Sequence, residues 1–193
     1  MKQIFHFVAS AVAVALVAAG SPTVISQAAQ GPGDERKAFL AALAAAETGD
    51  AIAQFNLAVM WDNGKGTLEN DAEALKWYRK AAVQDYAVAH FFVGVVYAEG
   101  RGVPQDDAEA LIWFRNAAEL GLASTQFKLG YMYSSGQGVT ENLAEAYFWF
   151  SLAASNGESG AEGARSVIEK RMTREQIAEA QRRSAAWKPK SSR

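Results

Sequence analysis

The sequence predicts an all-α solenoid of paired helices, and two observations support that prediction. The first is an internal repeat of 36 residues, which occurs over residues 51–86, 87–122 and 123–158. The second is that each copy holds two stretches whose apolar residues share one helix face. A fixed period of this length is typical of stacked supersecondary units that bury their apolar faces against one another. With the flanking segments, we expect nine helices and no strand.

The first helix of each copy is predicted from an apolar stripe that has a second apolar flank. In the first copy the stripe is Leu57, Ala58 and Trp61. The flank is formed by Ile52, Phe55 and Val59. A helix that is apolar on two sides lies between neighbouring helices.

The second helix of each copy has one apolar stripe and a marked beginning. An Asn or Asp precedes it, and a Glu follows three residues later, which is the spacing of a capping box with reciprocal bonds. The pairs are Asn70 with Glu73, Asp106 with Glu109 and Asn142 with Glu145. The aligned tryptophans, Trp77, Trp113 and Trp149, are predicted to lie in the core.

Between the two helices, every copy has a Gly-x-Gly sequence, which begins at Gly64, Gly100 and Gly136. Glycine adopts the left-handed backbone conformation that commonly ends a helix. We therefore expect these glycines to end each first helix and to reverse the chain.

Helical segments are also expected on both sides of the repeats. Residues 36–50 fit the second half of a preceding unit, with Ala38, Ala45 and Ala46 at the stripe positions, and predict an N-terminal capping helix. Residues 159–188 predict two C-terminal capping helices. A capping box at Thr173 and Gln176 opens the last one. Residues 29–35 are expected to be a linker, and residues 189–193 a basic tail.

The N-terminal 28 residues have the pattern of a secretory signal peptide. Lys2 precedes an uncharged apolar run from Phe7 to Ala19, which is too short to span a bilayer as a helix. Small residues at Ser26 and Ala28 predict cleavage after Ala28, with Ala19 or Gly20 as earlier candidates. The alternatives are an uncleaved anchor or a disordered tail. We expect a periplasmic or secreted protein without a membrane span after cleavage.

These motifs together resemble the Sel-one-like repeat, a relative of the tetratricopeptide repeat. The resemblance covers residues 36–158 and depends on three elements: Leu-Ala-x-Met-Trp, Gly-x-Gly and Ala-Glu-Ala-x-x-Trp-Tyr-x-x-Ala-Ala. It implies a right-handed αα superhelix that serves as an adaptor or scaffold, with the first helices lining the concave face. The implied function is non-catalytic binding of a peptide or protein in the bacterial cell envelope.

Tetratricopeptide geometry also implies which residues a partner would contact. They form an apolar strip with acidic and amide groups at its edge, suited to an amphipathic helix or extended segment with a few basic residues. The candidates are Ile52, Phe55, Val59, Asn63, Val88, Phe91, Val95, Glu99, Phe127, Tyr131 and Ser135. The alternative is that the phenylalanines Phe55, Phe91 and Phe127 are core residues.

The chain offers few groups for catalysis, so we expect no enzyme, cofactor or metal site. It has no cysteine, and His6 and His90 are its two histidines. Because His90 aligns with Gln54 and Gln126, it is interpreted as a polar packing residue. The recurring glutamates are interpreted as helix caps.

The sequence leaves a second function open. A cystine-linked branch of the Sel-one-like family has been credited with binding or cleaving β-lactams, although this chain lacks the paired cysteines. The alternative is therefore a module that binds or hydrolyses the cell wall, whether peptidoglycan or β-lactam. Nucleic acid is not expected as a partner, because the repeats are acidic.

Charge is unevenly distributed along the chain. Residues 29–158 carry 9 basic and 17 acidic side chains, whereas residues 159–193 carry 9 basic and 4 acidic ones. Such a chain could self-associate through the basic last helix of one copy and the acidic repeats of another. The simpler interpretation is a solvated acidic body with a basic last helix.

Overall fold

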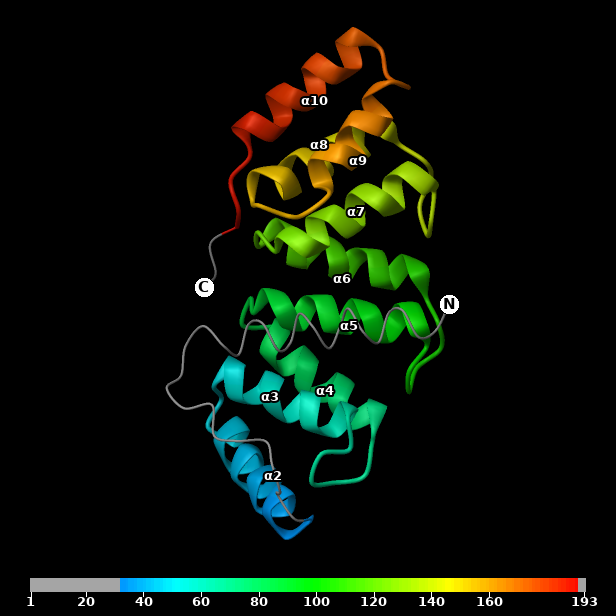
Figure 1. Ribbon diagram of the computed structural model, residues 1–193. Coiled ribbons are helices and arrows are strands. Elements are labelled where there is room, and N and C mark those ends of the chain that lie inside the picture. Colours follow the sequence, from blue (N-terminus) through cyan, green and yellow to red (C-terminus); the bar gives the residue numbers. More distant parts are fainter. Residues whose placement is uncertain (1–31, 191–193) are drawn as a thin grey trace. The chain divides into compact units, whose positions relative to one another are not determined.

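The computed structural model describes residues 32–190, and over this range the chain forms nine α-helices and no strand (Figure 1). The all-α prediction is confirmed. The predicted signal peptide lies outside the described residues. The helices are α2 (Pro32–Glu47), α3 (Ala51–Asp62), α4 (Asp71–Ala82), α5 (Ala87–Glu99), α6 (Asp107–Glu119), α7 (Ala123–Ser135), α8 (Leu143–Ser155), α9 (Ala161–Glu169) and α10 (Arg174–Ala186).

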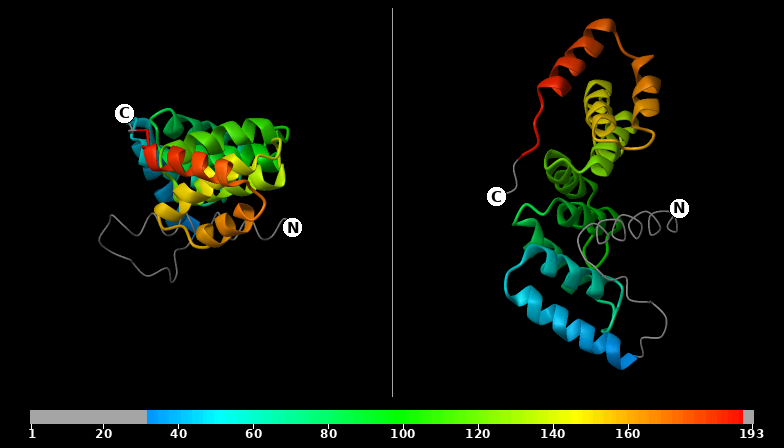
Figure 2. Two further views of the ribbon diagram at one scale, coloured as in Figure 1. Left: turned by 90° about the horizontal axis from the view of Figure 1, so that it is seen from above. Right: turned by 60° about the vertical axis from the view of Figure 1, so that its left-hand side comes forward.

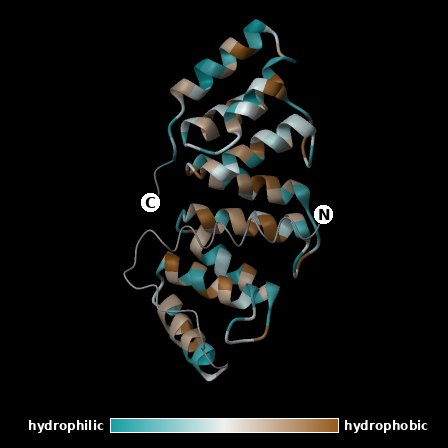
Figure 3. Ribbon diagram, in the orientation of Figure 1, coloured by the Kyte–Doolittle hydropathy of each residue, from teal (hydrophilic) through white to brown (hydrophobic). Residues whose placement is uncertain are grey.

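Each helix packs against the next one along the chain as far as α9, and Figure 2 shows this succession from two other sides. Helices α3 and α4, α5 and α6, and α7 and α8 form the three repeat hairpins. Helix α10 returns to pack on α8. Apolar and polar residues alternate around the helices (Figure 3), as expected when each helix has a buried and an exposed side.

The second helices begin as the sequence predicts. Their N-cap side chains each accept a hydrogen bond from the backbone N–H of the glutamate three residues later. The bonds are Asn70 with Glu73 at 3.0 Å, Asp106 with Glu109 at 2.9 Å and Asn142 with Glu145 at 3.1 Å. These caps satisfy N–H groups that have no partner inside the helix.

The reciprocal half of the predicted capping box is wrong for these three helices. Each N-cap N–H donates instead to a carbonyl near the end of the preceding first helix. The acceptors are Trp61 at 2.9 Å, Tyr97 at 3.0 Å and Tyr133 at 2.8 Å. The glutamate side chains are engaged elsewhere, with Lys76, with the indole of Trp113 and with Arg183 respectively. At α10 the predicted box with Thr173 and Gln176 is complete.

The loop glycines reverse the chain and also allow close packing between repeats. Gly102 has a φ of +64°, and a Cβ atom there would lie 2.8 Å from the Cβ of Asp71 at the start of α4. At Gly66, with a φ of +73°, a Cβ would lie 2.2 Å from the carbonyl oxygen of Glu35 in α2. The second glycine of the loop therefore serves both the turn and the contact with the previous unit.

The N-terminal capping helix differs from its prediction. Helix α2 begins at Pro32, inside the predicted linker, because proline is well suited to the first turn of a helix. Phe39 and Ala46 are buried, whereas Ala38 and Ala45 are exposed. The reason is that α2 packs chiefly against α3, so mainly one side of it is covered.

The aligned tryptophans are not equally buried. Trp77 and Trp149 are core residues, as predicted. Trp113 is half-buried, and its indole Nε1 donates to the Glu109 carboxylate at 2.9 Å. The middle repeat therefore keeps one edge of its tryptophan near solvent.

Candidate interaction surface

The three phenylalanines of the first helices pack within their own hairpins. Each ring contacts an aromatic ring on the second helix of the same repeat. The centroid distances are 5.5 Å for Phe55 and Tyr78, 5.7 Å for Phe91 and Phe114, and 5.4 Å for Phe127 and Phe150. These contacts and their burial favour a core role for Phe55 and Phe91, whereas Phe127 is only half-buried.

Burial divides the predicted contact residues into two sets. Phe55, Val88, Phe91 and Val95 are buried, so a partner cannot reach them in this structure without a rearrangement. Ile52 and Tyr131 are 55% and 58% exposed. The other accessible candidates are Asn63, Glu99 and Ser135, which are exposed, and Val59 and Phe127, which are half-buried. We call these seven accessible residues the first-helix face.

A polar network lies beside this face. The Tyr78 hydroxyl donates to Asp62 at 3.0 Å, and the Arg101 guanidinium pairs with Asp62 at 2.5 Å and with Glu99 at 3.1 Å. Burial and the neighbouring Asp62 carboxylate raise the pKa of Tyr78 well above its ordinary value. Arg101 fastens the second repeat to the first. This role was not predicted, and the one signal for it is a charged residue in the middle of a Gly-x-Gly loop.

A second polar arrangement recurs at the aligned glutamines. In the third repeat Asn156 donates to Gln126 at 2.8 Å, and Gln126 donates to the Ala118 carbonyl at 3.0 Å. The first repeat has the same chain of bonds, with Gln84, Gln54 and the Ala46 carbonyl. In the second repeat His90 and Leu120 hold the corresponding positions.

His90 is buried, and neither ring nitrogen has a hydrogen bond of good geometry. Its ring packs on Trp113 at a centroid distance of 5.4 Å. Burial lowers the pKa of His90, and nearby Lys190 lowers it further, whereas Asp85 and the Ala82 carbonyl act in the opposite direction. Since Leu120 cannot extend the chain of bonds, the imidazole is a packing residue.

The basic C-terminal part of the chain pairs with acidic residues of the same chain. Arg183 bonds the Glu145 carboxylate at 2.6 Å, and Arg171 pairs with Glu141. Lys190 pairs with Glu119 at the end of α6. Some of the basic side chains that were expected to attract another copy are therefore already paired within one chain.

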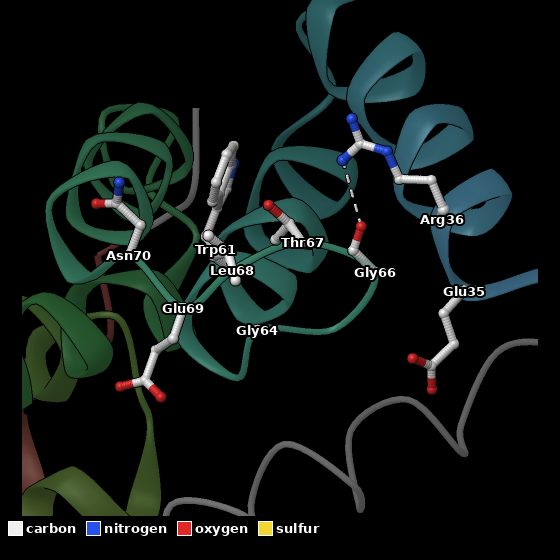
Figure 4. Close-up of a pocket in the computed structure, with 9 residues that line it drawn as sticks. All are labelled: Glu35, Arg36, Trp61, Gly64, Gly66, Thr67, Leu68, Glu69 and Asn70. Atoms are coloured by element: carbon white, nitrogen blue, oxygen red, sulfur yellow. Dashed lines mark hydrogen bonds between the residues drawn. The ribbon is translucent and has the colours of Figure 1, made fainter. Parts of the chain in front are cut away.

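A pocket of about 770 Å³ lies where the start of α2 meets the loop between α3 and α4 (Figure 4). Arg36 donates to the Gly66 carbonyl at 3.3 Å. The Trp61 indole N–H is buried without a hydrogen-bond partner. In Figure 4 the carboxylates of Glu35 and Glu69 point away from the guanidinium. The pocket therefore lies between the capping helix α2 and the α3–α4 loop, and its acidic and basic side chains are not brought together.

Residues 32–190 offer neither a metal cluster nor a membrane-spanning helix. No group of three or more His, Cys, Asp or Glu residues in that range is arranged to hold a metal ion. None of the helices described there has the length and apolar character that crossing a membrane requires.

The chain belongs to the Sel1 repeat family. The family model of the Sel1 repeat matches residues 51–86, 87–122 and 123–158, more than half of the chain. Sel1 repeat proteins are typically protein-interaction scaffolds. No curated protein gives a significant match to the chain.

Solved structures of similar proteins have the same kind of fold. A Sel1 repeat protein from Oxalobacter formigenes is 31% identical, with a TM-score of 0.64 over 70% of this chain and 54% of that chain. A protective antigen present in uropathogenic Escherichia coli strains is 29% identical, with a TM-score of 0.52 over 77% of this chain and 40% of that chain. This chain thus spans about half or less of their lengths.

The Helicobacter pylori cysteine rich protein B supports the fold alone. It is 24% identical, with a TM-score of 0.55 over 75% of this chain and 98% of that chain. The present sequence contains no cysteine. The all-α repeat fold is therefore shared without the cysteines for which that protein is named.

Proposed function

We propose that this chain is a non-catalytic scaffold of the bacterial cell envelope that holds a peptide or protein segment on its first-helix face. The observation that carries the proposal is the exposure of Ile52 and Tyr131 on helices whose other large apolar residues are buried or half-buried. Exposed aromatic and aliphatic side chains of this kind commonly anchor a partner. Membership of the Sel1 repeat family supports the same class of function.

The residues around these two side chains suggest the chemistry of the partner. Asn63 and Ser135 give the first-helix face polar groups, Glu99 adds a carboxylate that it shares with Arg101, and Val59 and Phe127 add apolar area. An amphipathic helix or an extended segment with a few basic residues fits this composition. Such a segment would place its apolar side chains against Ile52 and Tyr131.

The cellular location is part of the proposal. The apolar run from Phe7 to Ala19 and the small residues before Ala28 support export to the periplasm or beyond. The cell-wall alternative gains no support from the three recurring glutamates, because each is already engaged by a neighbouring side chain.

The experiment compares charged substitutions on the two helix types. Ile52→Asp and Tyr131→Asp should abolish capture of the native partner from the exporting cell, because each places a carboxylate in an apolar contact. The matched control is Ile112→Asp on α6, since Ile112 is 54% exposed, almost the same as Ile52. It should retain the partner.

Melting curves keep the comparison interpretable. All three positions are exposed, so the variants should unfold cooperatively at nearly the native temperature. Equal capture by the Ile52, Tyr131 and Ile112 variants would contradict the proposed site. Loss of capture on Ile112→Asp alone would move the site to the second helices.

A further inference from the structure

The segment that follows α10 adopts an extended conformation. Trp187 ends the helix with a φ of −71° and a ψ of 143°. Pro189 cannot continue a helix, and it restricts Lys188 before it to extended conformations. The free segment is therefore already restricted, and it loses less conformational entropy when it becomes ordered.

This extended segment reaches the turn between α6 and α7. The backbone N–H of Lys190 donates to the Glu119 carbonyl at 2.8 Å, and its ammonium group pairs with the Glu119 carboxylate. Pro189 lies beside Gly121, where a Cβ atom on the glycine would be 3.6 Å from the proline Cβ. One main-chain bond, one ion pair and one apolar contact thus meet at a single turn.

The turn has the features of a receptor for such a segment. Glu119 is the last residue of α6, so its carbonyl has no partner within the helix. A cation near a helix C-terminus is favoured by the helix dipole. Gly121 has a φ of +92°, a left-handed conformation that favours glycine at this turn.

The corresponding turn between α4 and α5 lacks these features. Val83 stands at the position of Glu119, and Asp85 stands at the position of Gly121. Val83 offers no carboxylate, and Asp85 replaces the glycine. The turn between α2 and α3 does have a glutamate and a left-handed glycine at these positions, Glu47 and Gly49. The two features therefore belong to two turns of the chain, and the α6–α7 turn differs in having the Lys190 segment bound to it.

We propose that the α6–α7 turn is a binding site for an extended basic peptide containing Pro-Lys, and that residues 187–190 of the same chain occupy it. A partner segment of this chemistry enters when the chain's own segment leaves. The site is separate from the first-helix face and does not depend on the proposed function of that face.

A labelled peptide with the sequence of residues 186–193 tests the proposal on the full chain. All chains compared carry Glu47→Lys, which removes the carboxylate of the matching α2–α3 turn. A tethered segment competes at an effective concentration on the order of millimolar, so the chain with Lys190 intact should not bind peptide at about 50 μM. Lys190→Glu reverses the charge that meets Glu119. It should expose the site and increase peptide binding about tenfold or more.

Two controls define the specificity. Lys188→Glu changes an exposed lysine of the same segment that has no ion pair, and it should leave the native behaviour unchanged. Glu119→Lys should prevent binding of the native peptide and permit binding of a peptide with glutamate in place of its second lysine. This reversal would show that the ion pair directs recognition.

Each remaining outcome overturns the proposal. Equal peptide binding by the chain with Lys190 intact and by Lys190→Glu would show that the segment does not occupy the turn. Absence of binding to Lys190→Glu, in a protein with native helicity, would show that the turn is not a peptide site. Substitutions at Ile52 and Tyr131 should not affect this assay, which separates it from the test of the first-helix face.

Discussion

The repeat hairpins and the C-terminal helix α10 are held in different ways. In the hairpins, buried aromatic pairs such as Phe91 with Phe114 connect the two helices. Helix α10 is largely exposed and is tied to α8 by polar contacts, with Arg183 on Glu145 and Gln181 on the Tyr147 hydroxyl. Apolar burial should therefore dominate the stability of the repeats, whereas charge should determine how firmly α10 is attached.

The largest expected effect comes from removing a buried aromatic residue of a repeat. Trp149→Ala should lower the free energy of unfolding by about 3–5 kcal/mol, because it empties a fully enclosed site. Urea unfolding followed by circular dichroism measures the loss. Trp113→Ala is the matched control and should cost less, since Trp113 is only half-buried. Equal losses would contradict the burial difference.

Replacing glycine by alanine should lower the stability in a repeat loop and raise it in the capping helix α9. Gly102→Ala should destabilise by about 1–3 kcal/mol, because the backbone has a φ of +64° and the new methyl group meets Asp71. Gly163→Ala, inside the capping helix α9, has no atom within 4 Å of the new Cβ and should stabilise by about 0.5–1 kcal/mol. Thermal melting of both variants checks the signs, and destabilisation by Gly163→Ala would be inconsistent with its open surroundings.

The second repeat lacks the chain of side-chain hydrogen bonds found in the other two, and substitution should restore it. His90→Gln combined with Leu120→Asn rebuilds the chain of bonds formed by Gln126 and Asn156, and should stabilise by about 1 kcal/mol. His90→Gln alone should gain less, because the amide oxygen would face Leu120. Urea midpoints of the single and double variants provide the comparison, and a double variant that gains no more than the single one would refute it.

The same substitution predicts a change in pH dependence. The folded-state pKa of His90 is lowered, so the unfolded chain binds the proton more readily. The contribution of His90 is fully present above the ordinary histidine pKa of about 6.5 and is lost as the pH falls toward the lower folded value. His90→Gln should remove this component from unfolding curves recorded across that range.

The smallest effect is expected at α10. High salt should weaken the contact between Arg183 and Glu145, which is partly exposed, by about 0.2–1 kcal/mol. Hydrogen exchange should therefore speed up in α10 at about 0.5 M salt and change little in α5 and α6. Uniform acceleration across these helices would remove the distinction between the two regions.

The repeat period was enough to predict the fold class, because each copy carries the same stripes, loop glycines and N-cap residues. The capping box shows where such reasoning fails. The spacing of Asn70 and Glu73 predicts one bond correctly, but the N–H of Asn70 binds the Trp61 carbonyl. A local pattern does not reveal that a neighbouring helix supplies a competing acceptor.

The candidate surface was harder to predict for the same reason. Phe91 and Tyr131 both lie on first helices, but Phe91 packs on Phe114 and Tyr131 is exposed. The docking of Lys190 on Glu119 depends on how α10 returns to α8, which no repeat pattern encodes. Only the excess of basic residues after residue 158 indicated that this part would meet an acidic one.

Site-specific photocrosslinking in the cell that produces the chain tests the central claim most directly. A photoreactive amino acid at Tyr131 should give a discrete protein adduct, because that side chain is exposed on the first-helix face. The same group at Ile112, which is equally accessible on a second helix, should give none. An adduct at Ile112 and none at Tyr131 would contradict the assignment of partner binding to the first-helix face.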